Sequence, residues 1–106
     1  MGQAGVPELA QSMKVEWSNE ALADLDRFVE FLDREHPSLA AIVATEIIEK
    51  VRVLSEHPQL GRPIAGREEY RQIVLQVLGA AYVFQYRFDD ERLVMLRVFH
   101  ARETRE

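Results

Sequence analysis

The sequence predicts an α+β fold: an N-terminal strand, then an antiparallel two-helix hairpin packed on a three- to four-stranded antiparallel sheet. Between residues 19 and 56, apolar side chains recur every three or four positions, as on one face of an α-helix. Between residues 70 and 100 the period changes to two, which is typical of half-buried strands joined by tight turns. A chain of 106 residues, 47% of them hydrophobic, suits one such domain.

The chain is expected to begin with a short extension. Residues 1–12 contain two glycines and a proline and show no sustained period, so they are expected to form a flexible N-terminal extension. Met13 is a candidate for the natural start, because structure is expected directly after it. Residues 14–17 alternate polar and apolar side chains and predict a strand, whose neighbour in the sheet cannot be assigned. The folded domain is therefore expected to span residues 13–103.

Two amphipathic helices are predicted next. Ser18 is a good N-cap for a helix over residues 19–35, from whose apolar stripe Asp24 falls away. Pro37 interrupts the pattern and opens a second helix over residues 38–56. The short link between them predicts an antiparallel hairpin. The first stripe is Leu22, Leu25, Phe28, Val29 and Leu32; the second is Leu39, Val43, Ile47, Val51 and Leu54, widened by Ile42 and Ile48.

The second half predicts an antiparallel meander. Glycines and a proline between residues 59 and 69 favour a loop. Alternating patterns then predict three strands with turns at 78–79 and 89–91. The strands are expected at residues 70–77, 81–88 and 92–100. In the last strand, Val94, Leu96 and Val98 are expected to face away from Met95 and Phe99.

Composition narrows the cellular context. The chain has no cysteine, which excludes disulfides and thiolate metal sites and fits a cytoplasmic protein. No apolar run approaches the roughly 20 residues of a membrane span, and the N-terminus has no secretion signal. No phosphate-binding loop or metal-ligand spacing is found, so we expect no cofactor and no metal.

Charge is distributed unevenly along the chain. The net charge of −5 argues against non-specific coating of nucleic acid, and no sequence-specific DNA binding is expected. Residues 58–106, however, hold eight basic residues, all of them arginine, against seven acids. Arginine in this concentration suits a surface that binds carboxylates or phosphates, although solvated strand faces would explain it equally well.

Five sequence blocks, taken in order, resemble the RelE/ParE family of bacterial toxins. Each block is weak alone, but their order and spacing are specific, and together they span residues 14–102. The blocks are VEWS with ALADL (15–18 and 21–25), LSEHPQLGRP (54–63), YRQI (70–73), YVFQYR (82–87) and VMLRVFHAR (94–102).

This resemblance implies the toxin of a type II toxin–antitoxin module, neutralised by a cognate antitoxin that wraps around it. RelE-like members of the family cut mRNA on the ribosome, whereas ParE-like members inhibit DNA gyrase and are not nucleases. Metal-free RNA cleavage needs a base, an acid and clustered cations. Here lysine is absent after Lys50 and tyrosine after Tyr86, so the resemblance favours the ParE-like branch.

The candidate site residues depend on which branch of the family the chain resembles. On the ParE-like branch no residue is assigned a catalytic role; on the ribonuclease alternative the candidates are Arg71, His100 and Arg102. A third possibility is an inactive member that only binds antitoxin. Arg71 and Arg97 are expected either to approach each other across the sheet or to pair with acids. The antitoxin- or target-binding candidates are Arg62, Arg67, Arg71, Arg87, Arg97 and Arg102.

Overall fold

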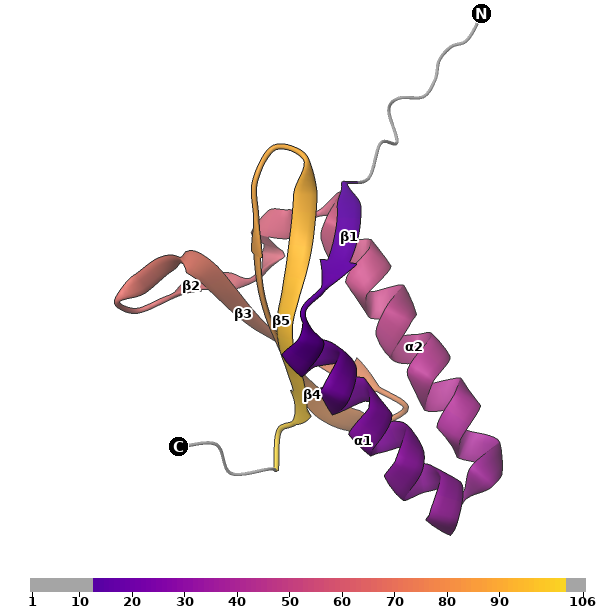
Figure 1. Cartoon of the computed structure of the whole chain (residues 1–106). Helices are drawn as coiled ribbons and strands as arrows, with labels where there is room; N and C mark the ends of the chain where they lie inside the picture. The colour runs from indigo at the N-terminus through magenta and orange to yellow at the C-terminus, as the bar shows by residue number, and fades with distance from the viewer. Residues whose placement is uncertain (1–12, 103–106) are drawn as a thin grey trace, which may run out of the picture.

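The structure is a computed structural model that describes residues 13–102 (Figure 1). The extension predicted for residues 1–12 lies outside the described residues, as does residue 103. Two helices and five strands follow one another, with a short 3-10 turn after the second helix. Their bounds are β1 Lys14–Trp17, α1 Asn19–Glu35, α2 Pro37–Glu56, η1 Pro58–Leu60, β2 Arg62–Ile64, β3 Arg67–Val77, β4 Ala80–Phe88 and β5 Arg92–His100.

The strands form one sheet in the order β1-β5-β4-β3-β2. The predicted meander is confirmed, since β4 pairs antiparallel with both β3 and β5. The N-terminal strand joins the sheet beside β5 and runs parallel to it, with Lys14 opposite Arg92 and Trp17 opposite Met95. The sheet therefore has five strands and one parallel pair, where three or four antiparallel strands were expected.

The loop predicted for residues 59–69 is the main error in the secondary structure. It contains η1, the edge strand β2 and the start of β3, which begins at Arg67 rather than at residue 70. Gly66 has φ +81°, a left-handed conformation that suits glycine in the tight turn between the two strands. Pro63 is tolerated because β2 is an edge strand, where a missing N–H need not interrupt the sheet.

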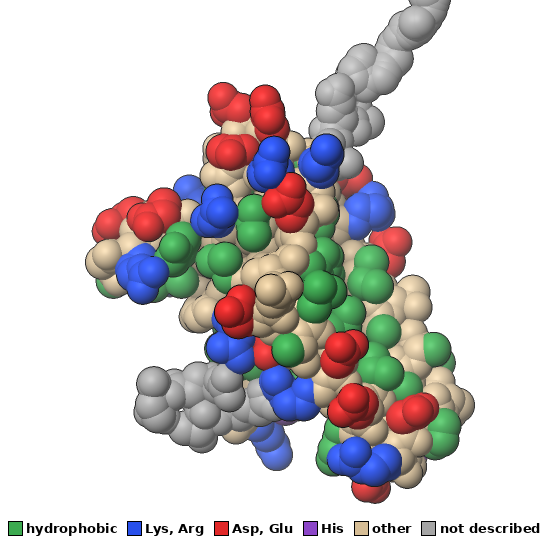
Figure 2. Space-filling model, in the orientation of Figure 1, with side chains coloured by type: hydrophobic (Ala, Val, Ile, Leu, Met, Phe, Trp, Pro, Cys, Tyr) green, Lys and Arg blue, Asp and Glu red, His purple; other side chains and the backbone are tan. Residues whose placement is uncertain are grey.

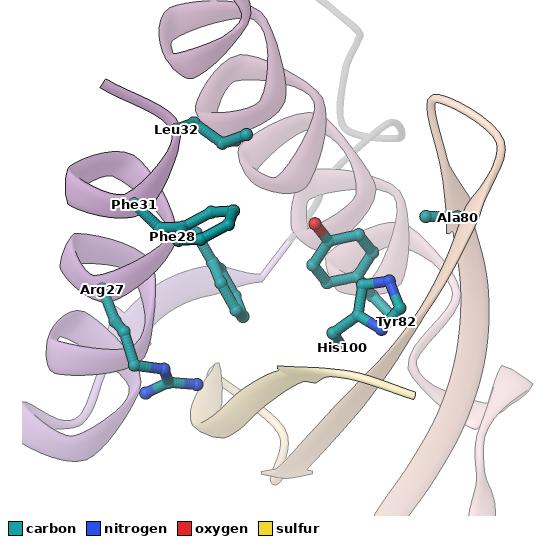
Figure 3. A pocket seen from close by; sticks show the side chains of 7 residues that line it. All are labelled: Arg27, Phe28, Phe31, Leu32, Ala80, Tyr82 and His100. Carbon is teal, nitrogen blue, oxygen red and sulfur yellow. The ribbon is translucent and has the colours of Figure 1, made fainter. Parts of the chain in front are cut away.

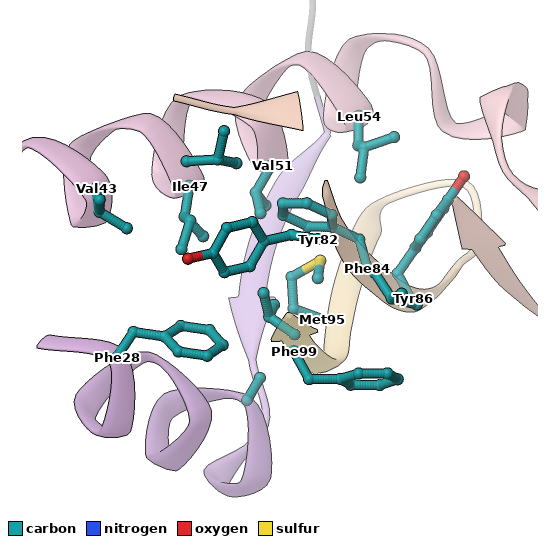
Figure 4. Packing of buried hydrophobic residues seen from close by; sticks show 14 of the residues in the cluster. Phe28, Val43, Ile47, Val51, Leu54, Tyr82, Phe84, Tyr86, Met95 and Phe99 are labelled. Carbon is teal, nitrogen blue, oxygen red and sulfur yellow. The ribbon is translucent and has the colours of Figure 1, made fainter. Parts of the chain in front are cut away.

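The helix hairpin covers one face of the sheet, and the core lies between them (Figures 1 and 4). Apolar side chains from α1, α2, β4 and β5 meet there and are fully or almost fully buried. This confirms the predicted packing of two apolar helix faces on one side of the sheet. The largest contributors include Phe28, Ile47, Leu54, Phe84, Tyr86 and Met95.

Two positions of α1 differ from the predicted stripe. Leu22 is 46% exposed, whereas Asp24, expected to face solvent, is only 2% exposed. On α2, Leu39, Ile42 and Ile48 are also exposed, so the buried face is narrower than the sequence pattern. Figure 2 shows the resulting hydrophobic side chains at the surface of the hairpin.

A bulge in β5 changes which of its side chains reach the core. Gln85 of β4 lies opposite Arg97 and Tyr86 lies opposite Met95, so Leu96 is the additional residue on β5. Met95 and Val98, which strict alternation placed on opposite faces, are consequently both fully buried.

Among residues 13–102, no helix is both long and apolar enough to span a membrane.

Candidate functional site

The sheet face that the helices leave uncovered carries a row of polar side chains. Directly opposed residues of neighbouring antiparallel strands share one face. Arg62 lies opposite Gln72, Gln72 opposite Gln85, and Gln85 opposite Arg97, so the four side chains cross β2, β3, β4 and β5 in line. In the middle of the row, Nε2 of Gln85 donates a hydrogen bond of 2.7 Å to Oε1 of Gln72.

A second group lies beside this row, nearer the β2–β3 turn. Tyr70 is opposite Arg87, and the guanidinium of Arg67 lies 4.7 Å from the centre of the Tyr70 ring. Arg67 and Tyr70 of this group and Gln85 and Arg97 of the polar row border a shallow hollow of about 580 Å³. The hollow is lined by Ser18, Glu20, Ile64, Arg67, Tyr70, Gln85, Leu96 and Arg97. We call Arg62, Arg67, Arg87 and Arg97, with Tyr70, Gln72 and Gln85, the arginine face.

The arginines of this face differ in what holds them. Arg97 forms a two-pronged contact with Asp24 of α1, Nε to Oδ2 at 2.8 Å and Nη2 to Oδ1 at 2.9 Å. Arg62, Arg67 and Arg87 are exposed, and none of them has a salt bridge within residues 13–102. Arg97 therefore joins α1 to the sheet, while the other three present their charge to solvent.

The carboxylate of Asp24 connects α1 to β5. Its carboxylate accepts four hydrogen bonds: two from Arg97, one from Nη1 of Arg27 and one from the backbone N–H of Val98. Burial alone would raise the pKa of Asp24, but the hydrogen bonds from Arg97, Arg27 and Val98 outweigh it and hold the pKa below its ordinary value. Asp24 is therefore a buried, ionised and fully hydrogen-bonded carboxylate.

Arg71 lies on the opposite, helix-covered face of the sheet. It is paired with Tyr86, whereas Arg97 is in the row of Gln72, so the two arginines do not approach each other. The alternative, pairing with an acid, holds for Arg97, which binds Asp24. Nη1 of Arg71 donates to the backbone carbonyl of Gly61 at 2.7 Å. The guanidinium also lies 5.4 Å from the centre of the Phe88 ring. Arg71 therefore fastens the segment before β2 to the sheet.

Tyr86, which lies in the core, also binds the segment between α2 and β2. Its hydroxyl donates to the carbonyl of Pro58 at 2.7 Å and accepts from the N–H of Gly61 at 2.8 Å. Burial raises the pKa of Tyr86, partly offset by the Gly61 hydrogen bond and the charge of Arg71. A Cβ on Gly61 would lie 2.6 Å from the Tyr86 hydroxyl, so only glycine fits there without a shift.

His100 and Arg102 lie at the other end of the sheet. His100 is opposite Tyr82, with their rings 5.2 Å apart, and its Nδ1 accepts from the backbone N–H of Arg102. The two aromatic rings border a groove of about 450 Å³ between α1 and the sheet (Figure 3). The groove is lined by Arg27, Phe28, Phe31, Leu32, Ala80, Tyr82 and His100.

The three ribonuclease candidates are not brought together. Arg71 is opposite Tyr86 and His100 is opposite Tyr82, four residues further back along β4. At roughly 3.3 Å per strand residue, their backbones are about 13 Å apart along the strand. Within residues 13–102, no three His, Asp or Glu side chains are grouped as metal ligands would be.

Sequence reasoning found the arginines but missed their neighbours. Tyr70, Gln72 and Gln85 fall within the YRQI and YVFQYR blocks, but nothing there marks them as site residues, because only strand register places them beside arginine. Asp24 did carry a signal, since it falls within the ALADL block that resembles the family. A carboxylate at that position of an otherwise apolar helix face could have been assigned a buried partner.

Three comparisons with known proteins agree with this fold. The family model described as ParE toxin of type II toxin-antitoxin system, parDE, matches residues 15–105. The chain is 32% identical over 91 residues to "Putative toxin Y4kP" of Sinorhizobium fredii, covering 85% of this chain and 90% of that protein.

Two solved structures share the fold. The chain resembles one from the chromosomal ParDE toxin–antitoxin system of P. aeruginosa with a TM-score of 0.67 and 23% identity, over 84% of this chain and 96% of that one. It resembles one from the RelBE2 toxin–antitoxin complex of Mycobacterium tuberculosis with a TM-score of 0.58 and 24% identity, over 87% and 94%. With the family model covering almost the whole described domain, the chain belongs to the ParE toxins of type II toxin–antitoxin systems, within the wider RelE/ParE family.

Proposed function

We propose that this toxin arrests growth by binding DNA gyrase through its arginine face and that a cognate antitoxin holds it inactive in the cytoplasm. The observation that carries the proposal is the exposure of Arg62, Arg67 and Arg87 on a sheet face without helices. Guanidinium groups that form no salt bridge within the described residues suit recognition of acidic protein surfaces. The family match to ParE supports gyrase as the target.

The antitoxin has a further surface on which to bind. The groove beside Phe28 and Tyr82 is apolar and open, as a site for an amphipathic helix would be. Contact there would leave the arginine face to meet acids of the antitoxin. The structural resemblance to chains of ParDE and RelBE2 complexes is consistent with such a partner.

The ribonuclease alternative has weaker support. It requires Arg71, His100 and Arg102 to act on one phosphate, but Arg71 is engaged with the carbonyl of Gly61 and lies on a different part of the sheet from His100. Cleavage by a single active site needs its groups within hydrogen-bond reach of the reacting atoms. Gyrase binding makes no such demand.

The test is expression of the toxin without antitoxin, together with a supercoiling assay on purified gyrase. We expect growth arrest, DNA damage and dose-dependent loss of supercoiling. The double variant Arg62→Glu/Arg87→Glu should lose most of this inhibition, whereas Arg34→Glu, an exposed change on α1, should retain it. Both variants should unfold at the wild-type denaturant concentration.

Other results would reject the proposal. Rapid site-specific mRNA cleavage with intact supercoiling would make the protein a RelE-like ribonuclease. Normal growth would make it an antitoxin-binding member without a target. A neighbouring short reading frame with a DNA-binding N-terminal part, whose product restores growth, would establish the antitoxin independently of the target.

A further inference from the structure

One edge of the sheet is left open by the shortness of β2. The three residues of β2 pair with β3 only between Arg67 and Gln72. Residues 73–77 of β3 pair with β4 on one side and have no strand on the other side among the described residues. The backbone groups of that side are therefore available to another strand.

The composition of this edge makes it unusual. From residue 72 to residue 86 the chain contains no charged side chain and no proline. Val74 is 53% exposed, and Leu60 and Leu78 nearby are exposed to a similar degree. Charges and prolines are the usual means by which a protein prevents edge pairing. The opposite edge, β1, has such protection, because it is four residues long and carries Lys14 and Glu16.

A groove of about 500 Å³ continues the open edge beside β2 and β3. Its apolar lining includes Leu60, Pro63, Ile64 and Val74, and Arg62 and Gln72 of the arginine face border it as well. An added strand along residues 73–77 would cover the exposed valine and narrow this groove. Backbone hydrogen bonding and burial of apolar surface thus both favour the addition of a strand along residues 73–77.

We propose that residues 73–77 pair with the same segment of a second copy, forming a two-fold symmetric dimer. Antiparallel pairing of a strand with itself requires a sequence that does not oppose like charges, and this segment has none to oppose. The basic end of the segment, at Arg71, would meet the uncharged turn at Leu78 and Gly79 of the other copy. Elsewhere the net charge of −5 disfavours contact between copies.

The geometry of this pairing has a functional consequence. The two-fold axis that relates antiparallel neighbours stands perpendicular to the sheet, so equivalent faces of the two copies lie on the same side. Both helix hairpins would cover one side of a continuous sheet, and both arginine faces would lie together on the other. The dimer would then offer two equivalent binding faces to one target, a bivalent arrangement that increases avidity.

Sedimentation velocity of the full chain over a wide concentration range tests the proposal. We expect reversible dimerisation of the wild type, weakened at least about tenfold in Val74→Lys/Gln76→Lys, where like charges face each other across the axis. Val74→Thr, which keeps an uncharged strand residue, and Val53→Lys, an exposed change on α2, should dimerise as the wild type does. Circular dichroism and denaturation verify that each variant is folded.

A rescue experiment makes the test specific. Mixing the Val74→Lys/Gln76→Lys variant with a Val74→Glu/Gln76→Glu variant should restore a dimer, because opposite charges then meet. A wild type that stays monomeric at every concentration overturns the proposal, as does undiminished dimerisation of the lysine variant. If the wild-type toxin is monomeric and the lysine changes weaken only antitoxin binding, the edge belongs to the antitoxin and the proposal is likewise rejected. None of these results depends on gyrase.

Discussion

The carboxylate of Asp24 accepts a hydrogen bond that a neighbouring strand would otherwise accept. β1 ends at Trp17, opposite Met95, so within residues 13–102 no strand lies beside the rest of β5 on its outer edge. Asp24 accepts the hydrogen bond of Val98 N–H and binds the side chain of Arg97 on the same edge. The buried charge is compensated by four donors, so its removal would leave them without this acceptor.

We predict that Asp24→Asn lowers the free energy of unfolding by about 2 kcal/mol near neutral pH, since charged hydrogen bonds are lost. The folded-state pKa of Asp24 is depressed, so its contribution is present above the unfolded-state pKa and is lost as the pH falls through the folded-state value. Urea denaturation at several pH values should therefore show the wild-type advantage shrinking below about pH 4.

Asp26→Asn is the matched control, because Asp26 is an acid on the same helix that is not buried. It should leave stability almost unchanged over the same pH range. A constant difference between wild type and Asp24→Asn at all pH values would contradict the assignment of an ionised Asp24.

A second residue-scale prediction concerns Gly61 and Tyr86. Gly61→Ala places a methyl group 2.6 Å from the Tyr86 hydroxyl and should lower the free energy of unfolding by about 1–3 kcal/mol. Tyr86→Phe should cost a similar amount, because the Pro58 carbonyl and Gly61 N–H lose their partner.

The two changes should not add. Once Tyr86→Phe has removed the hydroxyl, the alanine meets less obstruction, and a double-mutant cycle measured by denaturation should show favourable coupling. Additive costs would mean that the two groups do not meet as the structure describes.

At the scale of elements, the first turn of α1 is tied to β5. The Ser18 hydroxyl accepts from the N–H of Ala21 as an N-cap and donates to the carbonyl of Leu96. We predict that Ser18→Ala lowers the free energy of unfolding by about 1 kcal/mol, measured by chemical denaturation. Ser38→Ala, an exposed change within α2 where serine is not the cap, should have a smaller effect. Equal effects would argue against the cap.

The elements that sequence predicted well are those set by local patterns. The N-cap Ser18 and the break at Pro37 fix the helix ends, and the predicted bounds of residues 19–35 match α1. What could not be predicted depends on contacts distant in sequence. The partner of β1 is β5, nearly eighty residues away, and β2 exists because it pairs with β3 despite its proline.

The candidate site was predictable in composition but not in arrangement. The arginine content of the second half indicated an anion-binding surface, and the structure shows several of these residues on one face. The arginine content alone could not indicate that Arg97 pairs with Asp24 or that Arg71 lies on the opposite face of the sheet. Those assignments depend on strand register and on the bulge at Leu96, which no local pattern specifies.

For the whole molecule, the arginines fall into two classes that should behave differently. We predict that Arg62→Gln/Arg67→Gln/Arg87→Gln slows association with the antitoxin and flattens its salt dependence without changing stability, because these side chains are exposed. Arg97→Gln should instead lower the denaturation midpoint, because Arg97 joins α1 to β5.

Stopped-flow association rates at low and high salt, with denaturation curves for each variant, distinguish the two classes. The wild-type rate should fall steeply as salt increases, since exposed charges are screened beyond about 10 Å at 0.1 M. A wild-type rate that does not change with salt would exclude steering by arginine.

The parallel pairing of β1 with β5 makes closure of the sheet depend on the two ends of the described domain. A nascent chain exposes Lys14–Trp17 early, but the strand that receives it is the last one to be made. The domain cannot close while its C-terminal segment is still within the ribosome, and such distant pairing is slow to form. The sheet is therefore completed only after β5 has emerged, so the face that carries Arg62, Arg87 and Arg97 is assembled late in folding.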